Sequence, residues 1–368
     1  MTLRAEDFEV DADISAAQGL PAAAFREPAF ARLEQDTLFR SSWLLAPVAA
    51  PRERGGRAPF TLSGRPWFLQ RGWDDDVLRC FSNVCSHAWY PLVEAEGAGR
   101  TLVCGQHGRS FDVEGRCKAH KGFSGLPGFP HQTDHLRAAE LASLRSLTFV
   151  SEGPRAGFDC GALAECVARL PLEKMTVELD QRRVVAGNWK QHAWNYLDRF
   201  HIGFIHGGPR GLYEACDMAS YTTELHADSA LQWVHARRPD LGLRPEHLPE
   251  RLRGGPVFAL WWFVLPNLAL NFYPWGLSIN VFEPVPERAE VTLFRWMHLV
   301  MDEARYARRD ELWLSARVDA EDLAAMAAVR RSLGAGELPR GRFAPHEEAG
   351  AHWFHRAVYQ GVFSAGRG

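Results

Sequence analysis

The sequence has no long hydrophobic run and almost no net charge. Its longest apolar run, Val257 to Leu265, stops at Pro266-Asn267, whereas a helix that spans a bilayer needs about 20 apolar residues. The N-terminus, MTLRAEDFEVDADIS, lacks an apolar signal core and carries acids where a secretory signal carries bases. A formal net charge of −3 provides no general attraction to nucleic acid or an anionic membrane. We therefore expect a cytoplasmic protein of about two domains that binds neither.

Cysteine is also scarce, and its pattern argues against a disulfide framework. The seven cysteines are odd in number and scattered through a mid-sized chain, whereas disulfide scaffolds are small secreted domains. Five cysteines have no His or Cys at ligand spacing, and we interpret them as small buried hydrophobic residues. These five are Cys80, Cys117, Cys160, Cys166 and Cys216. Cys85 and Cys104 remain as candidate ligands.

Secondary-structure signals predict a helical entry segment, a small β domain and a larger α+β domain. Residues 21–42 have helical apolar spacing, and residues 58–150 contain short strand-like segments separated by Gly, Pro and Asp turns. The GWDDD turn at 72–76 is typical of a solvated hairpin tip. The later predictions are helices at 161–170, 188–206 and about 305–333, and strands at 177–185 and 256–300. A sheet with a long helix indicates an α+β domain that encloses a pocket.

Two Cys–His pairs are the strongest local signal. One residue separates Cys85 from His87, two separate Cys104 from His107, and sixteen lie between the pairs. Structural zinc sites usually group like with like, as Cys with Cys and His with His, but here each arm provides one of each. A Rieske [2Fe-2S] centre, with two thiolates on one iron and two imidazoles on the other, needs this distribution. We favour a Rieske cluster, with structural zinc as the alternative.

The segment GNWKQHAWNYLDRFHIGFIH at 187–206 contains a second candidate metal site. His201 and His206 are five residues apart, which on a regular helix is about 140° around the axis. Both imidazoles reach one metal only if the helix distorts between them, and Gly203 is the expected place. Two histidines and a distant carboxylate form the facial triad of non-haem Fe(II) oxygenases. We expect that carboxylate on the helix near the C-terminus.

Together the two motifs resemble the α subunits of ring-hydroxylating Rieske non-haem iron oxygenases. Cys-x-His, sixteen residues and Cys-x2-His is similar to their cluster motif. Asn-Trp-Lys at 188–190, then Asn-x2-Asp-x2-His-x4-His, is similar to their catalytic helix, and PNLALNFYPWGLS at 266–278 to one of their strands. The chain departs from the family at Ala88-Trp89, usually Arg-Gly, and at Gln106 and Arg109, usually Tyr and Trp.

The resemblance also selects the third iron ligand. The late helix offers Asp319, Glu321 and Asp322. The family pattern there is Glu-Asp followed, several residues later, by Gln-Arg-Gly-Leu, which Glu321-Asp322 and residues 330–333 match in spacing. Asp322 is therefore the expected ligand, with Asp319 and Glu321 as alternatives.

Asp198 and Asn195 are the other expected catalytic residues. A carboxylate that accepts the N–H of a metal-bound imidazole fixes the ring, which is the role expected of Asp198 toward His201. In the family this acid also contacts the second Rieske histidine of a neighbouring subunit. The resemblance therefore implies a path from His107 of one subunit through Asp198 to His201 of the next, in an α3 homotrimer closed by head-to-tail contacts.

The resemblance implies the complete fold and its cofactors. We expect an α+β chain with an N-terminal helical segment (1–43), a Rieske β domain (44–155) and a helix-grip (START-like) catalytic domain (156–368) with an antiparallel sheet and a long helix. The implied cofactors are a [2Fe-2S] cluster and one mononuclear Fe(II). Because the sequence has no Gly-rich dinucleotide fingerprint, electrons should come from NAD(P)H through a separate reductase or ferredoxin.

The expected activity is that of a terminal oxygenase, which uses O2 to hydroxylate or demethylate a small organic substrate. The NFYPWGLS region and the chain length are most similar to single-subunit oxygenases of choline, carnitine and betaine. Quaternary amines bind aromatic surfaces by cation–π attraction, and Trp261, Trp262, Tyr273 and Trp275 could form such a surface. The expected pocket residues are Phe204, Trp262, Asn271 and Trp275. The alternatives are an aromatic-ring dihydroxylating dioxygenase and, from another class, a Rieske electron-transfer protein without oxygenase activity.

Overall fold

The computed structural model describes residues 3–123, 125–154, 157–158, 160–208, 211–285, 287–309, 316–336 and 338–363. The chain forms two compact units. The large unit consists of Met1–Phe39 with Cys160–Gly368, and the small unit consists of Arg40–Asp159. Among the helices that the structure describes, none has the length and apolar character to cross a membrane.

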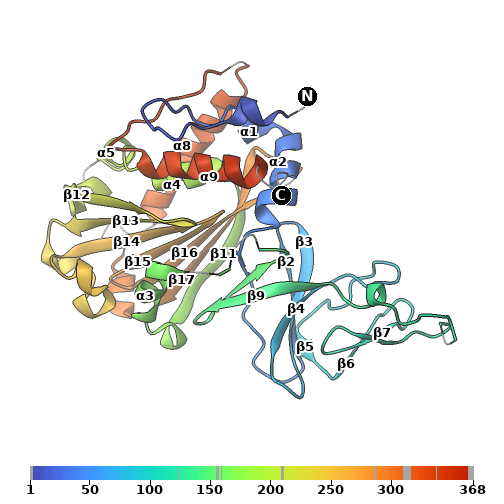
Figure 1. Ribbon diagram of the computed structural model, residues 1–368. Helices are drawn as coiled ribbons and strands as arrows, with labels where there is room; N and C mark the ends of the chain where they lie inside the picture. The colour runs from blue at the N-terminus through green and yellow to red at the C-terminus, as the bar shows by residue number, and fades with distance from the viewer. Residues whose placement is uncertain are drawn as a thin grey trace. The chain divides into compact units, whose positions relative to one another are not determined.

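The small unit is built from antiparallel strands (Figure 1). Seven strands form one sheet in the order β1-β10-β9-β4-β3-β2-β5, and three form a second in the order β6-β7-β8. In β2 the even-numbered residues are buried, as expected of a half-buried strand. The strands are β1 (Leu44–Leu45), β2 (Gly56–Leu62), β3 (Arg65–Arg71), β4 (Leu78–Ser82), β5 (Gly97–Ala98), β6 (Thr101–Val103), β7 (Ser110–Asp112), β8 (Cys117–Ala119), β9 (Ala138–Leu144) and β10 (Leu147–Ser151).

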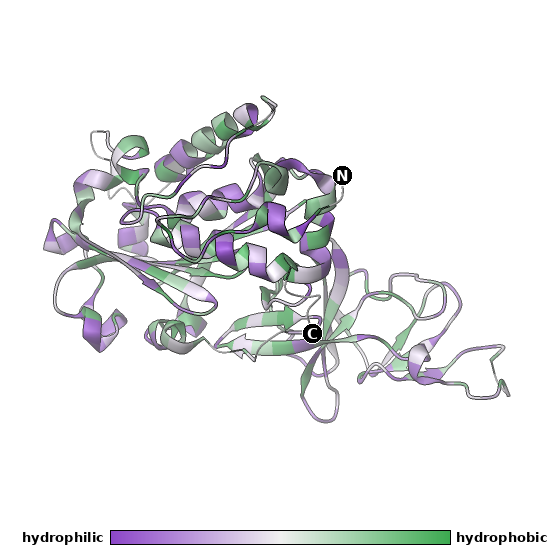
Figure 2. Ribbon diagram, turned by 45° about the horizontal axis from the view of Figure 1, so that its top comes forward, coloured by the Kyte–Doolittle hydropathy of each residue, from purple (hydrophilic) through white to green (hydrophobic). Residues whose placement is uncertain are grey.

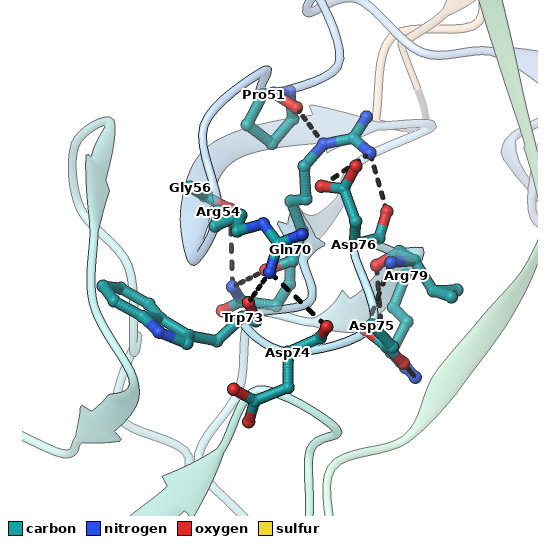
Figure 3. A network of polar contacts seen from close by, with 11 residues as sticks. Pro51, Arg54, Gly56, Gln70, Trp73, Asp74, Asp75, Asp76 and Arg79 are labelled. Carbon is teal, nitrogen blue, oxygen red and sulfur yellow. Dashed lines mark hydrogen bonds and ion pairs between the residues drawn. The ribbon is translucent and has the colours of Figure 1, made fainter.

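The turn between β3 and β4 is the predicted polar hairpin tip (Figure 3). Arg79 donates to the Asp75 carboxylate at 2.5 and 3.2 Å, and this hydrogen bonding lowers the pKa of Asp75 to about 2. Arg71 donates to the Asp76 carbonyl at 2.8 Å. Arginines of the flanking strands therefore hold the aspartates in a surface turn.

The large unit contains one seven-stranded antiparallel sheet in the order β11-β17-β16-β15-β14-β13-β12. All residues of β16 and nearly all of β14 are buried, so both faces of the sheet centre are covered. The strands are β11 (Thr176–Ala186), β12 (Cys216–Leu225), β13 (Ser229–Ala236), β14 (Val257–Val264), β15 (Leu268–Tyr273), β16 (Gly276–Pro284) and β17 (Val291–Val300). This sheet and its long helices agree with the predicted α+β class.

Helices α4, α8 and α9 lie on one face of this sheet (Figure 1). Hydrophilic and hydrophobic residues alternate along these ribbons (Figure 2), as expected of helices with one buried side. The helices are α1 (Ala23–Arg26), α2 (Pro28–Glu34), α3 (Gly161–Ala168), α4 (Trp189–Leu197), α5 (Ile202–Ile205), α6 (Leu212–Ala215), α7 (Glu303–Ala307), α8 (Ala316–Leu333) and α9 (Ala349–Phe363).

Three predicted helices are interrupted in the structure. In residues 21–42, α1 ends before Pro28, which begins α2, because the residue before a proline avoids the helical conformation. The predicted helix at 188–206 is also wrong as a single element. It breaks at Asp198, which is extended (φ −95°, ψ 113°), while Gly203 lies inside α5. The Asp198 side chain accepts the Phe200 N–H at 2.6 Å, and this local turn ends α4.

The predicted helix at about 305–333 corresponds to α7 and α8. α7 ends at Ala307 with Arg308 (φ −101°, ψ 10°) as its C-cap, so the prediction of one continuous helix is wrong; residues 310–315 lie outside the described residues.

The Asn-Trp-Lys segment joins α4 to the N-terminal segment. The Asn188 side chain caps α4 and also donates to the carbonyls of Phe25 and Ala289, at 3.1 and 2.6 Å. Lys190 Nζ lies 2.7 Å from Glu34 Oε1, and both side chains are almost completely buried. These contacts fix α4, and the chain that leaves its end leads to His201 and His206 at the two ends of α5.

Candidate metal centres

The two Cys–His loops of the small unit have the same backbone geometry. In each loop the cysteine N–H donates to the carbonyl five residues later at 2.8 Å, and the cysteine carbonyl accepts from the residue four positions later at 3.0 Å. That fourth residue, Trp89 or Gly108, has a positive φ of 62° or 72°. Gly108 adopts this conformation without strain, whereas Trp89 is a costly residue there. Cys85 and Cys104 therefore begin equivalent turns.

The four side chains fit a two-iron cluster better than a single ion. Both thiols are buried, and burial followed by the neighbouring Cys104 thiol raises the pKa of Cys85. The rings of His87 and His107 have centroids 4.8 Å apart. Nδ1 of His87 is buried without a hydrogen-bond partner among the described residues, which fits the role of a metal-binding atom.

Zinc fits these loops less well. A tetrahedral zinc ion, with bonds of about 2.0–2.3 Å, would hold its ligand atoms within about 4 Å of one another. Within the described ranges, one group of three His, Cys, Asp or Glu residues has its ligand atoms all within 4.8 Å of one another. This group lies in the large unit and not in these loops. That no such group of three is found among the loop ligands, within the described residues, fits two metals better than one.

The three candidate metal ligands of the large unit are His201, His206 and Asp322. Asp322 Oδ1 lies 3.1 Å from Nε2 of His206 and 3.7 Å from Nε2 of His201. The two rings have centroids 5.2 Å apart and are nearly perpendicular. The break at Asp198 and the short helix α5 bring both imidazoles to one point, and α8 provides the acid. Two histidines and one carboxylate are the donor set of a mononuclear iron site.

Neighbouring side chains orient two of these three residues. Glu321 Oε2 lies 2.8 Å from Nδ1 of His206, the outer ring nitrogen, which points away from Asp322. Arg317 donates to the other carboxylate oxygen of Glu321 at 2.9 Å. Asn195 donates to Asp322 Oδ1 at 2.9 Å. Burial acts to raise the pKa of Asp322, but the hydrogen bond and charge of His206 outweigh it and hold that pKa below its ordinary value. The carboxylate is therefore kept in the ionised form that binds metal.

Asp198 lies close to His201, but the two do not form a hydrogen bond. Asp198 Oδ2 is 3.6 Å from Nδ1 of His201, and this nitrogen has no hydrogen-bond partner among the described residues. The other carboxylate oxygen of Asp198 accepts from the backbone, as described above.

A cavity of about 110 Å³ opens beside the three candidate iron ligands. A buried water needs only about 10–15 Å³ on this measure, so the cavity has room for a small organic molecule. Its lining includes Asn195, Tyr196, Asp198, His201, Ile202, His206, Leu212, Tyr221, Gln232, Trp261, Asn271, Tyr273, Trp275, Ser278, Asn280, His298, Val318, Asp319 and Asp322. Asn271 and Trp275 thus lie where the sequence predicted them.

Phe204 and Trp262 do not line the cavity, which corrects the predicted pocket. Phe204 is 80% exposed on α5. Trp262 is completely buried, but it lies on β14 next to Trp261, and neighbouring strand residues point to opposite faces. The ring of Trp262 stacks on His226, with centroids 5.4 Å apart. Trp261 therefore faces the cavity, and Trp262 forms part of the core.

One cross-strand row forms much of the cavity wall. Strand pairing places Gln232 opposite Trp261, Trp261 opposite Asn271, Asn271 opposite Ser278, and Ser278 opposite His298. All five residues line the cavity. Sequence analysis missed three of them, because strand register is not evident from the sequence. Their common polar character within apolar strands was the available signal.

Residues 172–362 match the family described as ring hydroxylating alpha subunit (catalytic domain), and residues 43–130 match the Rieske [2Fe-2S] domain. The chain belongs to the ring-hydroxylating α-subunit family. It is the terminal component of a Rieske oxygenase, an oxidoreductase that uses O2, and its domains are of the types that bind a [2Fe-2S] cluster and a mononuclear iron.

Individual relatives are distant. The carnitine monooxygenase oxygenase subunit of Escherichia coli (strain K12) is 24% identical over 328 residues, which cover 85% of this chain and 84% of the relative. The crystal structure of the quaternary ammonium Rieske monooxygenase CntA in complex with L-carnitine has a TM-score of 0.75 and 18% identity, with coverage of 98% and 99%. Naphthalene 1,2-dioxygenase from Rhodococcus sp. bound to indole has a TM-score of 0.73 and 20% identity, with 95% of each chain covered.

Proposed function

We propose that this oxygenase acts on a small cationic amine, either quaternary or methylated, at the cavity beside His201, His206 and Asp322. The observation that supports this most strongly is the cavity itself, in which an aromatic wall and a half-buried acid lie next to the candidate iron ligands. We assign the cluster to Cys85, His87, Cys104 and His107. When bound, the cluster stores an electron, and the iron supplies the chemistry that activates O2.

The protein residues around the iron ligands have separate tasks in this proposal. Glu321 accepts the outer N–H of His206, which fixes the ring and leaves Nε2 free to face the metal. Asn195 orients the Asp322 carboxylate through its 2.9 Å hydrogen bond. The walls of the cavity position the substrate beside the iron ligands.

Aromatic rings supply the proposed cation site. Trp261, Tyr273 and Trp275 line the cavity, and Trp261 donates to the Tyr273 hydroxyl at 3.1 Å. The rings of Tyr273 and Trp275 have centroids 5.5 Å apart. An ammonium group held against such faces gains about 0.5–2 kcal/mol from cation–π attraction.

Asp319 supplies the opposite charge. It lines the cavity from α8, and burial, followed by the charge of Asp322, raises its pKa to about 7. A bound cation would favour the ionised form of Asp319. The relatives named as carnitine monooxygenase support the same class of substrate.

The test compares choline-type cations with a neutral isostere, in which a tert-butyl group replaces trimethylammonium. Isothermal titration into the metal-loaded protein should show at least about 10-fold tighter binding of the cation, and Asp319→Asn should reduce that preference by a similar factor. Equal binding of the cation and the isostere would contradict the amine proposal. The matched control is Asp302→Asn in the same unit, which should leave the ratio unchanged.

The alternative is an aromatic-ring dihydroxylating dioxygenase, which is supported by the fold similarity to naphthalene 1,2-dioxygenase. Oxidation products from the same protein, reductase and O2 distinguish the two proposals by mass. A cis-diol from an arene would favour the dioxygenase, and an aldehyde lost from a methylamine would favour the demethylase.

We also propose that the chain forms an α3 homotrimer in the cytoplasm, with His107 of one subunit next to Asp198 of its neighbour. Asp198 lines the cavity, and its Oδ2 lies 3.6 Å from Nδ1 of His201, a position that supports its place between the two metal centres. Light scattering should give about three times the chain mass. A monomer would contradict the proposal.

A further inference from the structure

Arg109 is a charged side chain buried inside the small unit, two residues after His107. It is 2% exposed. Its Nε donates to His120 Nδ1 at 3.2 Å, and its Nη1 donates to Ser86 Oγ at 3.0 Å and to Asp134 Oδ1 at 2.9 Å. A fully buried guanidinium requires such partners, because an isolated buried charge is very costly.

These contacts join the two candidate ligand loops. Ser86 lies between Cys85 and His87 in the first loop, whereas Arg109 follows His107 in the second. Ser86 Oγ also donates to the Asp134 carbonyl at 2.6 Å. The Arg109 guanidinium therefore connects both loops to the same aspartate.

The surroundings of the guanidinium strengthen its electrostatic effect. It lies over the rings of Phe123 and Phe129, 5.3 and 5.6 Å from their centroids. Its partner His120 packs edge-on against the ring of His87, with centroids 4.5 Å apart, and stacks on Phe123 at 4.2 Å. In apolar surroundings a charge acts over a longer range than in water.

We infer that Arg109 and Asp134 are positioning residues for the cluster that shift its reduction potential in opposite directions. The inference rests on the proposed cluster ligands. Reduction adds one electron to the cluster and makes it more negative. The fixed positive charge of Arg109 therefore stabilises the reduced form and raises the potential, while the negative charge of Asp134 lowers it. Through Ser86, the same network also holds the two loops together.

The experiment is a redox titration of the holoprotein with dithionite, followed by its rhombic paramagnetic signal and its visible absorption. Arg109→Gln should lower the midpoint potential, Asp134→Asn should raise it, and Arg109→Lys should lie between Arg109→Gln and the wild type. The matched control is Arg116→Gln, an arginine with a 65% exposed side chain in the same unit, which should leave the potential unchanged.

Ser86→Ala separates the structural contribution from the electrostatic one. This variant keeps both charges, so it should lose cluster faster in the presence of chelator but retain a potential close to that of the wild type. Shifts of the same sign in Arg109→Gln and Asp134→Asn, or no shift in variants that retain cluster, would overturn the inference. A wild-type protein without the rhombic signal would instead overturn the proposed cluster ligands.

Discussion

Replacing Glu321 by glutamine tests how the protein holds His206 against the metal. The Glu321 carboxylate lies 2.8 Å from the outer nitrogen of this ring, and Asp322 lies 3.1 Å from the inner one. An amide of the same shape keeps the volume but removes the charge that favours an N–H on the outer nitrogen. The inner nitrogen then becomes a poorer and less well oriented donor.

The size of the effect follows from the exposure of the pair. Loss of a group that orients a metal-bound histidine typically costs about 10–100-fold in metal affinity, or about 1.4–2.7 kcal/mol. The Glu321 side chain is 26% exposed and shares its charge with Arg317, so solvent and a second partner screen it. We therefore expect the lower end, about 10-fold.

The assay is competition for Fe(II) between the protein and a coloured chelator under anaerobic conditions, with Glu303→Gln on α7 as an exposed control. The control should bind iron as the wild type does. Unchanged affinity in Glu321→Gln would refute the orienting role. Complete loss of iron would instead make Glu321 a ligand, which is one of the alternatives considered from the sequence.

Three further changes test other parts of the molecule. Asp198→Asn should leave the iron and sulfide contents unchanged but stop the reduced cluster from driving substrate oxidation. If a single-turnover assay gave as much product as the wild type, Asp198 would not carry electrons from His107 of one subunit to His201 of the next. Lys190→Ala should reduce the free energy of unfolding by about 3–5 kcal/mol, because it leaves the Glu34 charge buried without its partner. The midpoint of urea unfolding measures this loss. The double variant Lys190→Met/Glu34→Leu should recover most of it. Burial lowers the pKa of His355 to about 3. As the pH falls, the unfolded chain therefore binds a proton at this residue at a higher pH than the folded chain does. Its contribution is complete above about pH 6.5 and is lost as the pH falls toward 3, at about 1.4 kcal/mol per pH unit. His355→Gln should flatten that part of the stability profile, and an unchanged slope would assign the acid sensitivity to other groups.

The sequence predicted the candidate metal residues better than the cavity around them. His201, His206 and Asp322 are identified by residue type and motif, and the structure brings all three within 4.8 Å of one another. The position of the helix break was not predictable in the same way. It depends on the Asp198 side chain accepting the backbone N–H of Phe200, a local hydrogen bond that competes closely with continued helix.

The cavity wall depends on strand register, which a single sequence specifies weakly. Trp261 and Trp262 are adjacent and chemically identical, but only Trp261 shares a row with Asn271 and Ser278. A shift of one residue in pairing would exchange their roles. The fold class was predictable because it needs only the existence of strands and helices, whereas the pocket required their exact alignment.

The most direct test of the two-centre account is the metal and sulfide content of the reconstituted chain and of two single variants. The wild type should contain about three irons and two acid-labile sulfides per chain. His206→Ala should lose about one iron and keep all its sulfide, while Cys104→Ser should lose about two irons and all its sulfide. A wild type without sulfide, or one variant that loses both centres while it remains folded, would contradict the account.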